Sequence, residues 1–230
     1  WRDTGHWSSN GHCFDIGATV ARALRRFEDT GNPFAGSAAP DTAGNGSLMR
    51  LAPVPLAFAS DPLAAVEHAA QMSRTTHGAT EAVDACRYDA GLIVGALQGV
   101  EKSALLAPHF APMGVDWHAA PLAPAIARIA AGSFTVRHPA AIRGTGYVVQ
   151  SLEAALWAFH TSDSFAEGAL KAVNLGEDAD TTGAIYGQLA GAYYGVEAIP
   201  ATWRARLSRL DEICALADGL LELAGSWEGD

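Results

Sequence analysis

The chain has 230 residues, a net charge of −10 and a hydrophobic fraction of 49%. This apolar share excludes a disordered chain, and the length suits one large domain or two small ones. Acidic residues outnumber basic ones 25 to 15, which argues against a protein that binds nucleic acid through a basic surface. The sequence shows neither a signal peptide nor a stretch approaching 18 apolar residues, so we expect a cytoplasmic protein without a membrane anchor.

Helix signals begin in the first third of the chain. Asp61 followed by Pro62 is typical of a helix start, because Asp caps a helix and Pro fits its first position. Apolar residues spaced close to every 3.6 positions then predict a helix over residues 81–100. Both segments favour an α-helical domain.

Helix signals continue to the end of the chain. Ser164 and Glu167 form a possible capping box, and Pro200 opens a last helix that Gly225 is expected to end. Only residues 133–136 have a β character. We therefore predict one all-α domain over residues 1–230.

The most informative segment, residues 176–183, reads Gly-Glu-Asp-Ala-Asp-Thr-Thr-Gly and precedes an apolar helical pattern. Asp178, Asp180 and Thr181 offer hard oxygen ligands of the kind that Mg²⁺, Mn²⁺ or Ca²⁺ prefers. The alternative is that these residues only cap the helix, where the helix dipole favours negative charge. The segment alone leaves both interpretations open.

The helix that follows carries glycine at every fourth position. Each glycine costs about 1 kcal/mol of helix stability relative to alanine. Four on one stripe predict that another helix or a ligand approaches this face closely. These are Gly183, Gly187, Gly191 and Gly195.

A second glycine-rich segment runs from residue 41 to residue 50. If a helix begins near Ser47, the backbone N–H groups of the Gly-Asn-Gly-Ser run would form an anion site suited to phosphate. A plain turn before a helix is the alternative. The run comprises Gly44, Asn45, Gly46 and Ser47.

Two further residues stand at expected loop-to-helix junctions. His77 follows Thr76 ahead of one helix and could contact a sugar or phosphate, although a structural histidine is the alternative. Tyr147 follows Gly146 and could stack on a base or ring, although a core aromatic residue is the alternative.

Taken together, these segments resemble the ADP-ribosylglycohydrolase family. The family motif Gly-Gly-Asp-Thr-Asp-Thr-(Ile/Thr)-Gly-Ala corresponds to residues 176–184, and Gly-Asn-Gly-(Ser/Ala)-x-Met-Arg corresponds to residues 44–50. The family's Thr-His pair, Gly-Tyr-Val run and Phe-Asp-Ile-Gly stretch are found at residues 76–77, 146–148 and 14–17. The motifs stand in the family order over nearly the whole chain.

The resemblance implies a compact orthogonal multi-helix bundle with a binuclear Mg²⁺ or Mn²⁺ centre beside an ADP-ribose cleft. It implies that Asp178, Asp180 and Thr181 bind metal, with Asp178 and Asp180 also catalytic. Asp41 matches a loop acid that assists catalysis in some members. The residues implied to contact ADP-ribose are Gly44, Asn45, Gly46, Ser47, His77 and Tyr147.

The front of the chain departs from the family pattern. Members carry a Thr-Asp-Asp metal motif near the N-terminus, and this chain has none. We therefore expect a domain that lacks its N-terminal metal-binding segment and binds metal weakly. The implied activity is hydrolysis of the glycosidic bond that links ADP-ribose to a modified side chain of a protein or to a small conjugate. The alternative is a non-catalytic ADP-ribose-binding or structural relative that has lost its binuclear metal centre.

Overall fold

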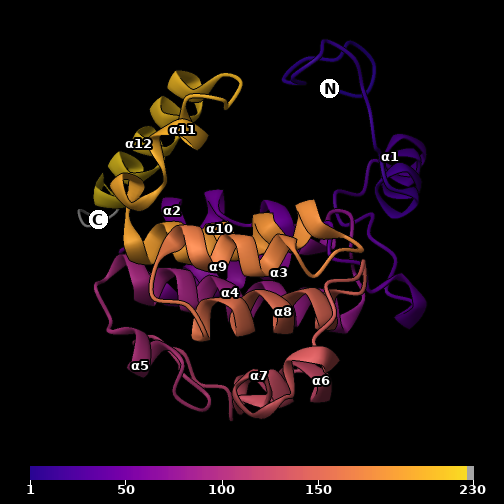
Figure 1. Ribbon diagram of the computed structural model, residues 1–230. Helices are drawn as coiled ribbons and strands as arrows, with labels where there is room; N and C mark the ends of the chain where they lie inside the picture. The colour runs from indigo at the N-terminus through magenta and orange to yellow at the C-terminus, as the bar shows by residue number, and fades with distance from the viewer. Residues whose placement is uncertain (227–230) are drawn as a thin grey trace.

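Helices make up the architecture in Figure 1, and the computed structural model describes residues 1–226. Within those residues, β pairing is confined to two isolated bridges, so the all-α prediction is confirmed. The α-helices are α1 (Ala18–Thr30), α2 (Pro53–Ala57), α3 (Pro62–Arg74), α4 (Thr80–Leu97), α5 (Lys102–Leu105), α6 (Pro124–Ala130), α7 (Ser133–Val136), α8 (Val148–His160), α9 (Phe165–Val173), α10 (Ala179–Tyr194), α11 (Ala201–Arg204) and α12 (Leu210–Ser226). Four 3-10 turns join them: η1 (Pro40–Thr42), η2 (Leu48–Arg50), η3 (Pro139–Ala141) and η4 (Val196–Ala198).

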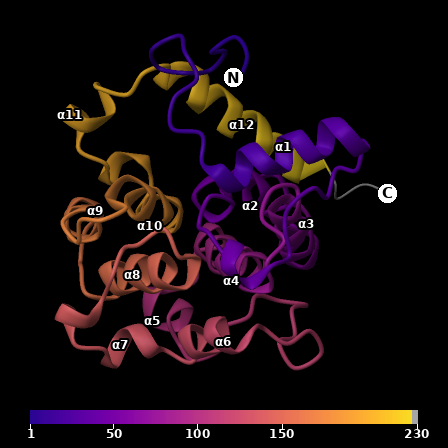
Figure 2. The ribbon, with the colours of Figure 1, turned by 90° about the vertical axis from the view of Figure 1, so that its right-hand side faces the viewer.

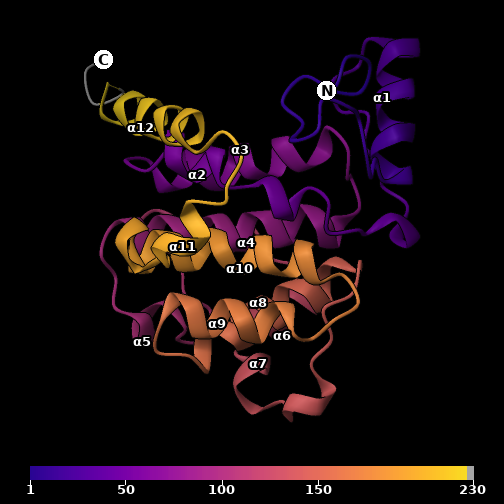
Figure 3. The same ribbon diagram turned by 45° about the horizontal axis from the view of Figure 1, so that its top comes forward.

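Helix α4 forms the centre of the core. It is buried almost continuously from Ala82 to Ala96 and packs against α3, α8 and α10. A helix that is apolar on most sides has to be surrounded by other elements, and Figure 3 shows α10 running beside α4 with α8 and α9 on one side. The loops that carry the sequence motifs lie at the ends of these central helices.

Two predicted helix starts are confirmed. The Asp61 side chain accepts a hydrogen bond from the backbone of Ala64 at 3.0 Å, and Pro62 is the first residue of α3. The Ser164 hydroxyl accepts from the Glu167 backbone at 3.2 Å, so the cap of α9 forms as expected.

Two local predictions are wrong. Residues 133–136 form the short helix α7, because a turn opened by Gly132 at φ 93° directs them into the helical bundle. The single C-terminal helix expected from Pro200 onward is divided into α11 and α12, with Arg209 at a positive φ of 61° before α12. Figure 2 shows α12 lying across α2.

None of the helices in residues 1–226 combines the length and apolar character needed to cross a bilayer.

The glycine stripe of α10 has a close neighbour at one position. A Cβ on Gly183 would lie 2.8 Å from Val173 of α9, whereas Gly187 and Gly191 have nothing within 4 Å of that position. Gly195 ends the helix at a φ of 79°. The close approach predicted for the whole stripe is therefore found only where α9 and α10 meet.

Candidate functional site

Three segments that are far apart in the sequence meet through their backbones. Residues 44–47, hereafter the glycine loop, pair with the turn before α8: Asn45 N–H donates to Gly146 C=O at 3.1 Å. Val148 N–H donates to Ala43 C=O, also at 3.1 Å. Residues 177–182, hereafter the carboxylate turn, join them because Asp178 N–H donates to Gly144 C=O at 2.9 Å.

Asn45 connects the glycine loop to the carboxylate turn through its side chain. Its amide nitrogen donates to Asp178 Oδ2 at 2.7 Å and to Thr145 C=O at 3.2 Å. The side chain is buried, so both bonds are shielded from water. Asn45 thus fixes the distance between two predicted substrate and metal regions.

Buried hydroxyl and thiol groups support the glycine loop from α3 and α4. Ser47 is completely buried and its hydroxyl lies 2.9 Å from that of Ser73 and 3.6 Å from the Cys86 thiol. The turn η2 begins directly after Ser47, as the anion-site prediction requires, but it is only three residues long. In residues 1–226 the backbone N–H groups of Gly46 and Ser47 have no acceptor, but only Gly46 has exposed surface, so its N–H alone is available to a ligand. The burial of Ser47 argues against the direct contact with ADP-ribose that the resemblance implies for it.

His77 lies beneath the glycine loop and is 3% exposed. A Cβ on Gly46 would be 2.9 Å from the imidazole Cε1, so only glycine fits there without displacing the ring. Burial, followed by the nearby positive charge of Arg50, lowers the pKa of His77 to about 4. The ring is therefore neutral at physiological pH and supports the loop from inside the protein.

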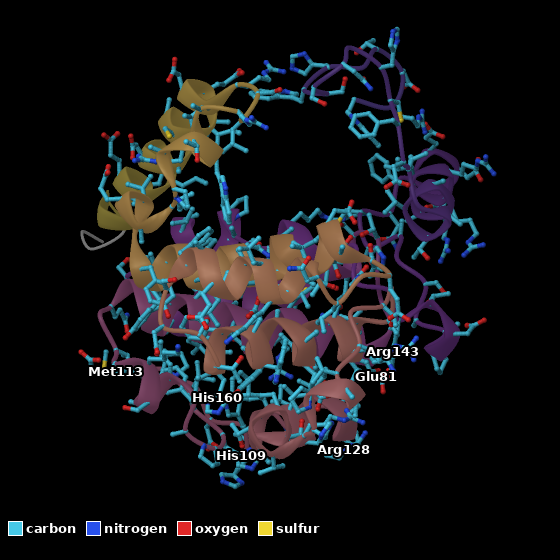
Figure 4. All side chains as sticks on the ribbon, in the orientation of Figure 1. Glu81, His109, Met113, Arg128, Arg143 and His160 are labelled. Atoms are coloured by element: carbon cyan, nitrogen blue, oxygen red, sulfur yellow. The ribbon has the colours of Figure 1, made fainter. Side chains whose placement is uncertain are left out.

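Tyr147 stands on the outer side of the same loop, with its side chain 40% exposed. It lines a cavity of about 310 Å³ together with Asp41, Gly44 and Gly146. Its hydroxyl donates to Glu81 Oε2 at 2.6 Å, and partial burial together with this bond raises the pKa of Tyr147 to about 12. Figure 4 labels Glu81 near Arg143 at the end of the bundle where these loops gather.

The carboxylate turn forms the start of α10. Asp178 occupies the N-cap position, yet its side chain makes no capping hydrogen bond to α10, and it accepts from Asn45 instead. Asp180 is exposed, and the Thr181 hydroxyl has only a 3.7 Å contact with the Met49 sulfur. The Thr182 hydroxyl is buried without a partner. The turn thus presents several oxygen atoms that capping does not use.

These oxygen donors suit a hard divalent cation by their chemistry. Residues 1–226 nevertheless bring together no group of three or more His, Cys, Asp or Glu side chains able to hold a metal ion. The roles of Asp178, Asp180 and Thr181 as metal ligands stay predictions.

Sequence reasoning missed two features of the site. Glu81 holds Tyr147, and only the fold places the first turn of α4 beside residue 147. Glu177, which stands where the family motif has glycine, adopts a positive φ of 57° and pairs with Arg143. The sequence offered a signal for this backbone conformation, because the family motif has glycine at position 177 and a positive φ favours glycine.

Comparison with known proteins identifies the family of the chain. The ADP-ribosylglycohydrolase family model matches residues 1–230. The chain belongs to the ADP-ribosylglycohydrolase family. A solved structure described as an ADP-ribosylglycohydrolase-related protein complex superposes with a TM-score of 0.79 and 45% identity, covering 90% of this chain and 69% of that one. This likeness confirms the expected fold type.

Curated relatives within the family have named activities. The ADP-ribosylarginine hydrolases Tri1 of Serratia proteamaculans (strain 568) and Pseudomonas putida (strain GB-1) are 34% and 38% identical over 97% of this chain. The ADP-ribosyl-[dinitrogen reductase] glycohydrolase of Rhodospirillum rubrum is 32% identical over 92% of it. The chain spans 59% and 58% of the length of the two Tri1 proteins and 67% of the third relative.

Proposed function

We propose that this chain forms the ADP-ribose-binding part of a metal-dependent hydrolase that releases ADP-ribose from modified arginine side chains. The observation that carries the proposal is the Asn45 side chain, which joins the glycine loop to Asp178 of the carboxylate turn. Two relatives named as ADP-ribosylarginine hydrolases, both matching 97% of the chain, favour arginine as the acceptor. The partner would be an ADP-ribosylated protein or a small ADP-ribosyl conjugate.

In this proposal the glycine loop binds the diphosphate and the adjacent ribose. The free N–H group of Gly46 donates to a phosphate oxygen, and glycine lets the ligand approach the backbone closely. Tyr147 contributes the flat face of its ring at the edge of the 310 Å³ cavity. Hydrogen bonds from three sides of the loop hold this geometry before the ligand arrives, which reduces the entropy lost on binding.

The carboxylate turn would hold the metal through Asp178, Asp180 and Thr181. When bound, Mg²⁺ or Mn²⁺ would orient ribose hydroxyls and lower the pKa of a water molecule. Asn45 donates to one oxygen of Asp178 and thereby orients the carboxylate. Because the chain has no Thr-Asp-Asp motif, we expect it to bind metal weakly.

Cleavage of the glycosidic bond passes through a transition state with oxocarbenium character. Asp41 lines the cavity from η1 and is exposed, so its carboxylate could accept a proton from water. Asp178 and Asp180 would contribute to catalysis by holding the metal. The water oxygen bonds to the anomeric carbon as the C–N bond breaks, and the proton that Asp41 takes from this water passes to the departing arginine nitrogen.

The test is hydrolysis of ADP-ribosyl-arginine and ADP-ribosyl-serine peptides with and without Mg²⁺. The substrates are given to this chain and to a version extended upstream to the length of its Tri1 relatives. We expect the extended protein to release ADP-ribose from arginine only when Mg²⁺ is present, and this chain to be much slower. Release of ADP-ribose from serine peptides alone would contradict the proposal that arginine is the modified residue.

Binding of ADP-ribose by both proteins without hydrolysis by either would favour the non-catalytic alternative. Equal hydrolysis with and without metal would contradict the proposed metal dependence. Two tightly bound Mg²⁺ ions per 230-residue chain in a calorimetric titration would contradict the weak affinity expected here.

A further inference from the structure

Beneath the glycine loop, Arg50, Thr76 and His77 form a chain of hydrogen bonds. A guanidinium N–H of Arg50 donates to the Thr76 hydroxyl at 2.8 Å, and this hydroxyl lies 2.8 Å from His77 Nδ1. Thr76 is 8% exposed and His77 is 3% exposed. Water has little access to either side chain, so their polar atoms depend on each other.

The donor and acceptor in each of these hydrogen bonds follow from Arg50, because a guanidinium group can only donate hydrogen bonds. The Thr76 oxygen accepts that bond, and in residues 1–226 its hydrogen has no acceptor other than His77 Nδ1. Leaving a buried hydroxyl hydrogen unpaired is costly, so Thr76 donates and Nδ1 accepts. A neutral imidazole that accepts at Nδ1 carries its proton on Nε2.

The protonated Nε2 atom lies against the two glycines of the loop. A Cβ atom added to Gly46 would lie 3.1 Å from His77 Nε2, and one added to Gly44 would lie 3.5 Å from the same atom. No group in the described part of the chain accepts a hydrogen bond from Nε2. The absence of side chains at both glycines leaves room for an acceptor oxygen beside this almost buried donor.

We propose that Arg50 and Thr76 are positioning residues that keep the His77 proton on Nε2, so that this N–H donates to an oxygen of ADP-ribose bound at the glycine loop. The identity of the ligand rests on the proposed function, whereas the position of the proton does not. Arg50 also donates to Gly46 C=O at 3.1 Å, so one guanidinium fixes both the loop and the ring beneath it.

The test combines imidazole ¹⁵N–¹H spectra at pH 7 with calorimetric titration of ADP-ribose into the full chain. Thr76→Val removes the hydroxyl with little change in size, and Thr76→Ser restores it. Thr75→Val is the matched control, because the Thr75 hydroxyl also accepts from Arg50, at 3.4 Å, but donates to Met72 C=O and not to His77. The His77 signals are assigned by their loss in His77→Gln.

We expect wild type, Thr76→Ser and Thr75→Val to show an unprotonated Nδ1 and a protonated Nε2. Thr76→Val should show a mixture of the two neutral forms and bind ADP-ribose about tenfold more weakly. A proton on Nδ1 in the wild type, or Thr76→Val spectra and affinity equal to wild type, would overturn the inference. If no protein binds ADP-ribose, the proposed function fails, and the spectra alone decide the position of the proton. If Thr76→Val does not fold, the wild-type spectrum still decides the position of the proton, because a proton on Nδ1 overturns the inference.

Discussion

The glycine loop and the carboxylate turn face each other across one site but are supported very differently. Buried side chains from α3 and α4 lie beneath the loop, where Ser47 and His77 have almost no exposed surface. The turn has an exposed carboxylate at Asp180 and an unpartnered hydroxyl at Thr182. In residues 1–226 the glycine loop is therefore packed against buried side chains, whereas part of the carboxylate turn is open to solvent.

Because of this difference, substitutions in the two regions should affect folding stability and ligand binding differently. Changes at the glycine loop disturb buried contacts, so they should alter folding and ligand binding together. Changes at the carboxylate turn touch few contacts within the chain, so they should alter metal binding while folding stays the same. Substitutions across the two regions test this separation.

The largest effect is expected from Asp89, which lies in α4 three residues after Cys86, whose thiol contacts Ser47 of the glycine loop. The carboxyl is 1% exposed, its Oδ2 has no partner, and burial raises the pKa of Asp89 from 3.8 to about 7. Between these two pKa values only the folded state holds the proton, so stability falls as pH rises and levels off above pH 7.

Asp89→Asn removes this ionisation and keeps the size of the side chain. We compare the free energy of unfolding of Asp89→Asn with that of wild type at each pH. This difference should favour the variant by about 2–4 kcal/mol more at pH 8 than at pH 4. Urea unfolding of both proteins at the two pH values measures this difference. A change in stability that is the same at pH 4 and pH 8 would show that Asp89 does not titrate in the folded core.

The next largest effect is expected from Gly46→Ala. The new Cβ would lie 2.9 Å from His77 Cε1, so the ring or the loop has to move, at a cost of about 1–3 kcal/mol. ADP-ribose affinity should fall with stability. Gly187→Ala in α10 is the control, since nothing lies within 4 Å of its Cβ, and it should gain up to about 1 kcal/mol from helix propensity. Equal stability changes in both variants would contradict the close packing under the loop.

Asn45→Ala should have an intermediate effect, because it removes the bond between the two regions. The loss of hydrogen bonds to Thr145 and Asp178 should cost about 1–2 kcal/mol and weaken both ADP-ribose and Mg²⁺ binding. Thermal unfolding and calorimetric titration measure these quantities. The exposed Asn174→Ala is the control and should leave all of them unchanged. Normal Mg²⁺ binding in Asn45→Ala would show that the two regions act independently.

The smallest effect on folding is expected from Asp180→Asn. Asp180 is exposed, so stability should change by less than about 0.5 kcal/mol. Its Mg²⁺ affinity should fall at least about tenfold if this carboxylate is a ligand. Asp218→Asn on α12 makes the same change in net charge at an exposed position and should retain wild-type affinity. Asp180→Asn with wild-type Mg²⁺ affinity would remove this residue from the proposed ligand set.

Local signals in the sequence predicted two helix caps correctly. Asp61 and Ser164 cap their helices as expected, because capping depends on neighbours within one turn. Where a segment depended on distant neighbours, prediction failed: residues 133–136 became α7, and the single helix expected from Pro200 onward is divided into α11 and α12.

The fold class and the family could be read from the sequence alone, since these follow from helical periodicity and short motifs. The sequence left open whether Asp178 caps α10 and whether His77 is structural. The tertiary structure showed that Asp178 accepts from Asn45, 133 positions away, and that His77 is buried beneath the glycine loop. Contacts of this kind depend on where the chain brings distant segments together, and no local pattern contains that information.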